Sequence, residues 1–133
     1  MTRGAAILLA LGLAQPAVPQ DETKEERLVL PSGLAAYLHE TRSDRPAGDL
    51  VYRFRFVAPA FSGQEDFAVL TADLEFLCNI RALPLADKAR PRPDRIVVSL
   101  ADKPSEFGRF DPDVTQIFET FSVKDGTCIW EIF

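Results

Sequence analysis

Very few side chains in this sequence are suited to catalysis, because its 133 residues include one histidine and two cysteines. His39 lies in a predicted strand beside Tyr37 and Glu40, and no Ser or Cys motif surrounds it. The seven glycines are not clustered, so the sequence has neither a phosphate-binding loop nor a nucleophile elbow. We therefore expect no catalytic and no cofactor-binding residues. A small hydrolase or lyase that uses His39 with nearby carboxylates remains an alternative.

Acidic residues are numerous, but they do not form a metal-binding pattern. Four of them crowd the predicted loop at residues 102–113, where two prolines interrupt the series. A calcium loop needs oxygen ligands at regular spacing, and structural zinc needs four ligands, whereas only His39 could join the two cysteines. We expect no metal site. The loop's two phenylalanines, Phe107 and Phe110, are expected to fold back onto the core.

The spacing of apolar residues predicts an amphipathic helix over about residues 64–82. Steps of three and four place five apolar side chains on one helix face: Phe67, Leu70, Leu74, Leu77 and Cys78. Four polar side chains are expected on the opposite, solvated face: Asp66, Asp73, Glu75 and Asn79. Ser62 and Glu65 fit a capping box before this helix. Pro84 is expected to end it, because proline has no backbone N–H to donate.

Alternating and continuous apolar runs predict the strands. Aromatic residues and arginines alternate along residues 50–58, which predicts one buried and one solvated face: Tyr52, Phe54 and Phe56 against Arg53 and Arg55. Residues 34–41 also read as a strand, and residues 28–30 could pair with it across the turn at Pro31-Ser32-Gly33. Residues 95–101 hold a run of β-branched side chains, which is typical of a central strand.

The last segment, residues 114–133, reads as a β-hairpin. Asp125-Gly126 is a strong signal for a two-residue turn, because both residues tolerate positive φ. With these two residues as the loop, Val123 lies opposite Cys128 and Phe121 lies opposite Trp130. One face of the hairpin is then apolar and of the right size to receive the helix.

The two cysteines are expected to form a disulfide. Cys78 lies on the apolar face of the predicted helix, and Cys128 lies on the helix-facing side of the last strand. The bond would close a loop of about fifty residues, for which the chain-entropy model gives a stabilisation of roughly 4 kcal/mol. The alternative is a pair of buried free thiols, since cysteine also packs as a small apolar residue.

The N-terminus predicts export. Residues 1–14 combine a positive start at Arg3 with an apolar run and small residues before Pro16, which is the pattern of a secretory signal peptide cleaved after Ala14. The apolar run of eleven residues is too short to span a bilayer as a helix. Residues 15–27 are polar and hold two prolines, so we expect a disordered leader before one domain at residues 28–133.

The composition and net charge of the chain restrict the classes of molecule that it could bind. The chain is 47% apolar and 26% charged, which is ordinary for a soluble globular domain of this length. Its formal net charge of −5 argues against nucleic acid, because an acidic surface repels the phosphate backbone. We expect a periplasmic or secreted protein without a stable membrane span after signal cleavage, with an unidentified protein partner possible in that compartment.

Four segments resemble a family of short exported bacterial proteins without an assigned function: 52–59, 73–78, 93–100 and 125–131. The likeness covers about residues 50–133, and it implies a small exported domain in which both cysteines belong to the shared pattern. It carries over no catalytic residue. Some relatives carry an acetolactate synthase label, but this chain is several times shorter than that enzyme and shows no thiamine diphosphate site.

We therefore predict a single α+β domain. One helix packs on a mostly antiparallel sheet of four to five strands, in the chain order β-β-α-β-β-β. The expected function is that of a non-enzymatic exported accessory or binding protein. Besides the hydrolase or lyase alternative, a structural module that pairs through an exposed strand edge is a third possibility.

Overall fold

A computed structural model describes residues 4, 12 and 26–132 of the chain. Apart from residues 4 and 12, the predicted signal peptide lies outside these residues, as does all but the end of the predicted leader. The elements follow in the order β1 (Leu28–Val29), β2 (Ala35–Asp44), β3 (Val51–Val57), α2 (Phe67–Leu77), η1 (Cys78–Ala82), α3 (Leu83–Lys88), β4 (Arg95–Ala101), β5 (Gln116–Lys124) and β6 (Thr127–Trp130).

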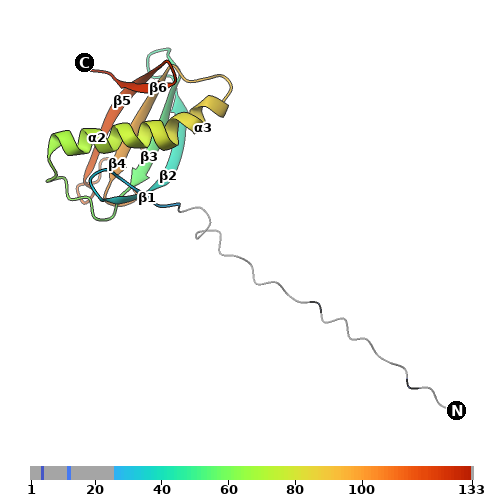
Figure 1. The fold of residues 1–133 in the computed structure, drawn as a ribbon, viewed down its shortest axis with the longest axis vertical. Helices are drawn as coiled ribbons and strands as arrows, with labels where there is room; N and C mark the ends of the chain where they lie inside the picture. The colour runs from blue at the N-terminus through green and yellow to red at the C-terminus, as the bar shows by residue number, and fades with distance from the viewer. Residues whose placement is uncertain (1–3, 5–11, 13–25, 133) are drawn as a thin grey trace.

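The strands form one sheet in sequence order, β1-β2-β3-β4-β5-β6, and the helical segment crosses one face of it (Figure 1). Every neighbouring pair is antiparallel except β3 and β4, which are parallel because the helix connects them. The predicted α+β class and mostly antiparallel sheet are confirmed. The sheet has six strands rather than four to five, since residues 28–29 do form a short edge strand.

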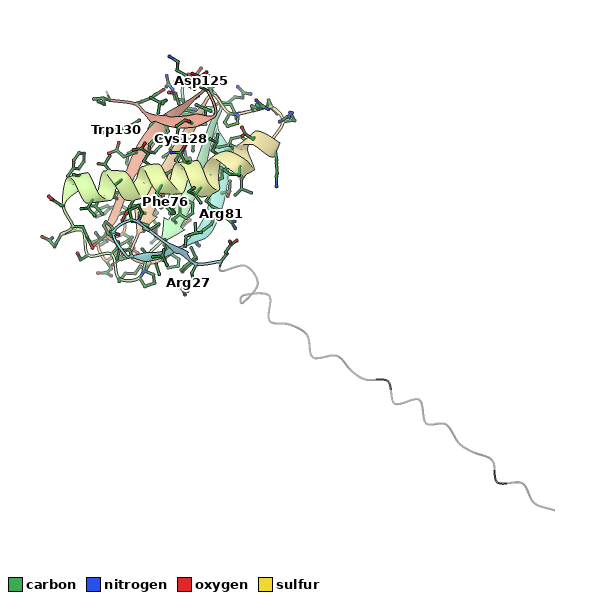
Figure 2. The ribbon with its side chains drawn as sticks, in the orientation of Figure 1. Arg27, Phe76, Arg81, Asp125, Cys128 and Trp130 are labelled. Carbon is green, nitrogen blue, oxygen red and sulfur yellow. A yellow bond between two sulfur atoms is a disulfide. The ribbon has the colours of Figure 1, made fainter. Side chains whose placement is uncertain are left out.

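The hairpin register agrees with the sequence. Phe121 pairs with Trp130 and Val123 pairs with Cys128, as the Asp125-Gly126 turn predicted. Asp125 and Gly126 adopt φ values of 52° and 71°, which is the left-handed geometry that this short turn requires. Trp130 lies beside the helix (Figure 2), where its ring centroid is 6.2 Å from that of Phe67. Its indole Nε1–H donates to Glu119 Oε2 at 2.6 Å.

The helix does not end at Pro84, so this prediction is wrong. The chain passes through the π-helical segment η1 and continues as α3 to Lys88. Leu83 N–H donates to Cys78 O, five residues earlier, and Pro84 follows within the first turn of α3. A first-turn residue needs no N–H partner inside its own helix, so the proline is tolerated there. The Ser62–Glu65 hydrogen bonds do form, but they lie in the loop before the helix N-cap.

Two side chains of α2 differ in burial from the prediction: one expected in the core is exposed, and one expected in solvent is buried. Phe67 is 64% exposed although the spacing placed it on the apolar face. Asp73 is completely buried although the spacing placed it in solvent. Its carboxylate accepts hydrogen bonds from Ser32 N–H at 2.9 Å and from Ser32 Oγ at 2.5 Å. The helix therefore buries Asp73 because the β1–β2 turn covers it and supplies two donors.

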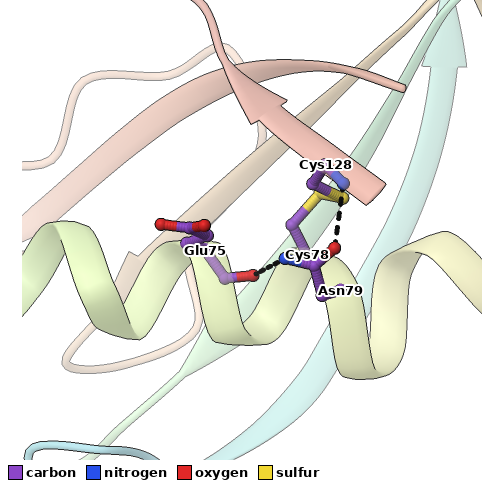
Figure 3. The surroundings of a disulfide bond; sticks show 4 residues. All are labelled: Glu75, Cys78, Asn79 and Cys128. Carbon is purple, nitrogen blue, oxygen red and sulfur yellow. Dashed lines mark hydrogen bonds between the residues drawn. A yellow bond between two sulfur atoms is a disulfide. The ribbon is translucent and has the colours of Figure 1, made fainter. Parts of the chain in front are cut away.

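The core lies between the helix and the sheet. Its largest fully buried apolar side chains come from three central strands and from α2: Phe54, Phe56, Ile96, Val98, Leu100, Phe121, Leu74 and Leu77. A disulfide joins Cys78 of η1 to Cys128 of β6, with Cα atoms 6.2 Å apart. Next to it, Cys128 N–H donates to Asn79 Oδ1 at 2.8 Å (Figure 3). The helix is thus attached covalently and by a hydrogen bond to the C-terminal strand.

Candidate functional site

The sheet face opposite the helix carries two aligned rows of side chains. Residues that pair across neighbouring strands point to the same face, so the register fixes each row. One row crosses the sheet as Glu40, Arg55, Ser99 and Phe118. The next row is Arg42, Arg53, Val97 and Thr120. In Figure 1 the helix lies in front of the sheet, so this second face points away from the viewer.

Arg55 is the most buried of the three arginines in these rows. It is only 6% exposed, whereas its position in the strand pattern predicted a solvated side chain. Its Nη1 donates to Glu40 Oε2 on the neighbouring strand, and its Nη2 donates to Ser105 Oγ at 3.2 Å. Both terminal nitrogens of this buried guanidinium are therefore occupied, as a buried charge requires.

Glu40 binds two arginines at once. Besides Arg55, it accepts from Arg42 Nη1 at 2.7 Å. The hydrogen bond from Arg42 is the largest cause and lowers the pKa of Glu40, while burial comes second and opposes it. The hydrogen bond and charge of Arg55 lower this pKa further, so the net shift is downward. Arg53 is held differently, since its Nε lies 3.2 Å from both carboxylate oxygens of Asp44.

The connection between β4 and β5, residues 102–115, folds over this face. Its two ends are tied together, because Asp102 N–H donates to Thr115 O at 3.1 Å and Thr115 N–H donates to Asp102 Oδ1 at 3.0 Å. Phe107 lies among all three arginines, with ring centroid to guanidinium carbon distances of 4.6 Å for Arg42 and 5.5 Å for Arg53 and Arg55. These cation–π contacts anchor the loop on the arginine face.

A cavity of about 410 Å³ lies between the loop and the sheet. Its walls combine apolar and basic side chains from three strands and the loop: Arg53, Arg55, Val97, Ser99, Phe107 and Phe118. Phe118 is 63% exposed, and Phe110 at the rim is 89% exposed. The expectation that Phe107 and Phe110 fold onto the core is therefore wrong: Phe107 covers the opposite sheet face and Phe110 faces solvent.

The candidate catalytic residue considered from the sequence, His39, does not line this cavity. His39 is exposed on β2 at the irregularity between Leu38 and Glu40, and it makes no hydrogen bond or ion pair with any residue that the structure describes. Within residues 26–132 we find no group of three or more His, Cys, Asp or Glu side chains that could hold a metal ion. Nor is any helix in this range long and apolar enough to cross a bilayer.

A family model matches most of the chain. It describes a family of unknown function, DUF6497, and it matches residues 10–133. The chain belongs to this family. Comparisons with curated proteins and with solved structures find no match. Membership in DUF6497 agrees with the absence of an assigned function that the sequence resemblance implied, and it supports neither export nor an acetolactate synthase label.

Sequence reasoning missed the cavity of this DUF6497 chain, although part of the signal was visible. The alternation of Arg53 and Arg55 with buried aromatics marked one sheet face as basic. A long connection containing Phe107 and Phe110 followed the central strand. Long structured loops often carry function, and aromatic residues near arginines suggest cation–π contacts. Only the register of the strands, however, shows that these groups lie together.

Proposed function

We propose that this DUF6497 chain is an exported, non-enzymatic binding protein whose ligand occupies the cavity between the β4–β5 loop and the sheet. One observation carries this proposal: the cavity is built on three strands, and the arginine-anchored Phe107 positions its roof. Its volume of about 410 Å³ falls within the range typical of small-molecule sites, which are concave, largely apolar and lined by a few polar groups.

Export is supported by the sequence and by the disulfide together. The pattern of residues 1–14 is that of a signal peptide, and a disulfide between two buried cysteines is typical of an oxidising compartment. We infer that the mature chain begins near Gln15, that residues 15–27 form a leader and that the domain begins at about residue 28. Mass spectrometry of the protein recovered from a periplasmic fraction tests this inference, and an intact N-terminus with free thiols would contradict it.

A catalytic function has less support. The alternative that we considered requires His39 to lie within hydrogen-bond reach of a carboxylate in a cleft. His39 is instead exposed, has no hydrogen-bond or ion-pair partner among the described residues and does not line the cavity. The polar side chains that line the cavity include arginines and carboxylates that are hydrogen-bonded to neighbours, and this arrangement suits recognition of a ligand.

The binding proposal is tested by titrating the isotope-labelled, disulfide-intact chain with a library of small compounds and following backbone amide shifts. We expect binders to shift amides of β4 and of residues 105–111 while those of α2 stay unchanged. Phe118→Ala removes an exposed wall residue and should weaken such binders. Val29→Ala, an exposed residue of similar character on β1, serves as the control. Binders that shift only other surfaces, or a library without any binder, would refute the proposal.

A second candidate, pairing through a strand edge, is favoured by the unequal lengths of β5 and β6. The ladder between them runs only from Phe121 to Lys124, so the first half of β5 has an open edge. Glu131 N–H donates to Thr120 O, which shows that even-numbered residues of β5 turn their backbone groups toward this edge. Gln116 and Phe118 therefore offer backbone donors and acceptors that a strand of another chain could use.

This candidate predicts that a protein partner can be crosslinked to β5. Photocrosslinking from position 116 in the exported protein should capture the partner, whereas the same probe at position 29 on the opposite edge should not. Capture from both positions, or from neither, would remove the strand-edge candidate.

A further inference from the structure

We propose that the cavity binds a small amphipathic carboxylate, whose head group contacts Arg53 and Ser99 and whose apolar body lies against the aromatic walls. This inference rests on the binding function proposed above and specifies the chemistry of the ligand.

Ser99 provides the first reason. Its side chain is only 5% exposed, yet its hydroxyl forms no hydrogen bond with any residue that the structure describes. None of the fully buried side-chain oxygens and nitrogens in the described part of the chain lacks a partner. The Ser99 hydroxyl must therefore reach solvent, and it can do so through the cavity that it lines. A nearly buried polar group that lines a cavity without a protein partner is a natural contact for a ligand.

Arg53 provides the second reason. Only the Nε–H of Arg53 donates to Asp44. In Arg55, by contrast, Nη1 donates to Glu40 and Nη2 donates to Ser105. The Nη groups of Arg53 donate to no described residue, and the side chain lines the cavity. They form a planar fork of N–H groups, which matches the geometry of a carboxylate. Both Nη groups of Arg53 are therefore available to a ligand, whereas each Nη of Arg55 already makes a hydrogen bond.

The charged side chains that line the cavity favour an anionic ligand, because they comprise three arginines, Arg53, Arg55 and Arg109, and two carboxylates, Glu106 and Asp111. Glu40 accepts from two arginines, Asp44 accepts from Arg53, and Glu106 accepts from Arg109 Nη1 at 3.4 Å. Asp111 accepts from the backbone N–H of Asp113 at 3.0 Å. The lining therefore carries a net positive charge, and the Nη groups of Arg53 can donate to an anionic acceptor. An ammonium ligand would instead meet carboxylates that already accept hydrogen bonds from Arg109 and from the Asp113 backbone.

The apolar side chains of the lining indicate the size and chemistry of the apolar part of the ligand. Val97 forms part of the floor, and Phe107 and Phe118 form walls on either side of it. Phe110 stands at the rim with most of its ring in water, so a ligand body can gain apolar contact by covering it. The volume of about 410 Å³ is at the small end for ligand pockets, so a single ring or a short branched chain is the appropriate size.

The test compares three phenyl compounds of similar size and different charge: phenylacetate, phenylacetamide, which is its neutral isostere, and phenethylamine. Each is titrated into the disulfide-intact chain while the amide and side-chain shifts around Ser99 and Phe107 are followed. We expect phenylacetate to bind at least about 10-fold more tightly than either of the other two, since a hydrogen bond to a charged group contributes about 1.5 kcal/mol or more.

Arg53→Gln and Ser99→Ala should each weaken phenylacetate by about 10-fold or more and leave phenylacetamide nearly unchanged. Arg95→Gln is the matched control, because Arg95, like Arg53, is a strand arginine that forms an ion pair, here with Asp49 and Glu131, but it does not line the cavity. If Arg53→Gln fails to fold, Ser99→Ala, which removes one oxygen, still provides the test.

The outcomes separate the two proposals. Equal binding of phenylacetate and phenylacetamide at this site, with no effect of Arg53→Gln or Ser99→Ala, would overturn the carboxylate assignment and leave the binding site itself standing. Preferential binding of phenethylamine would overturn it in the same way. If no probe and no library compound shifts the cavity residues, the binding function is refuted together with this inference.

Discussion

Reduction of the Cys78–Cys128 disulfide should lower the free energy of unfolding by about 4 kcal/mol. The bond closes a loop with a sequence separation of 50, and the loss of loop-closure entropy in the unfolded chain gives this value. Domains of this size have a total stability of about 5–15 kcal/mol, so the loss is a large fraction of the total. The reduced protein is the best comparison, because both thiols can stay buried at the junction of η1 and β6.

Urea unfolding of the oxidised and reduced protein, followed by far-ultraviolet circular dichroism, measures this difference. We also expect a larger dependence on urea after reduction, because the unfolded chain without the crosslink exposes more surface. Cys78→Ala/Cys128→Ala is the second reference, and it should lose somewhat more than the reduced protein because it also removes two buried sulfurs. A loss below about 1 kcal/mol in the reduced protein would refute the entropic reasoning.

Three further predictions concern single side chains. Asp73→Asn should lower the stability by about 1–3 kcal/mol in thermal unfolding, because an amide N–H₂ would replace one of the oxygens that accept from Ser32. Gly63→Ala should lower it by roughly 1 kcal/mol, since Gly63 has φ +81° and its Cβ would lie 2.7 Å from Thr115 Cγ2; adding Thr115→Ser should recover only the part due to the clash. The lowered pKa of Glu40 adds stability that is present above its ordinary pKa of 4.5 and is lost as the pH falls through the folded-state pKa. The stability difference between wild type and Glu40→Gln should therefore shrink on going from about pH 6 to about pH 3 in urea unfolding, and a constant difference would contradict the assignment.

Local signals in the sequence predicted the hairpin and the central strands well. The Asp125-Gly126 turn fixes the register of its neighbours by its own backbone geometry, so Cys128 is placed opposite Val123 without any tertiary information. The same spacing argument failed for Asp73, because the β1–β2 turn that satisfies its carboxylate is 41 residues away in the chain. Helical periodicity reports which residues share a face, but not which other segment covers that face.

Pro84 shows a second limit of local reasoning. The rule that proline ends a helix assumes regular i→i−4 hydrogen bonding, and η1 changes that pattern just before the proline. The cavity shows a third limit. Arg53, Ser99 and Phe107 come from two strands and a long connection, and only the parallel pairing of β3 with β4 brings the first two together. No single segment of the sequence contains all the residues that line the cavity, so no local pattern could reveal it.

The two faces of the sheet are closed in different ways, and this difference supports the proposed position of the binding site. The helix face is sealed by apolar packing, by the buried Asp73 and by a disulfide, so a change there costs stability. The opposite face is covered by one loop, which is tied at its neck by Asp102 and Thr115 and held at its tip by the stacking of Phe107. Exposed cation–π contacts contribute about 0.5–1 kcal/mol each, which is small compared with the disulfide. The loop is therefore held less firmly than the helix, which is what the proposed binding function requires of a segment that adjusts to a ligand while the helix face keeps the fold intact.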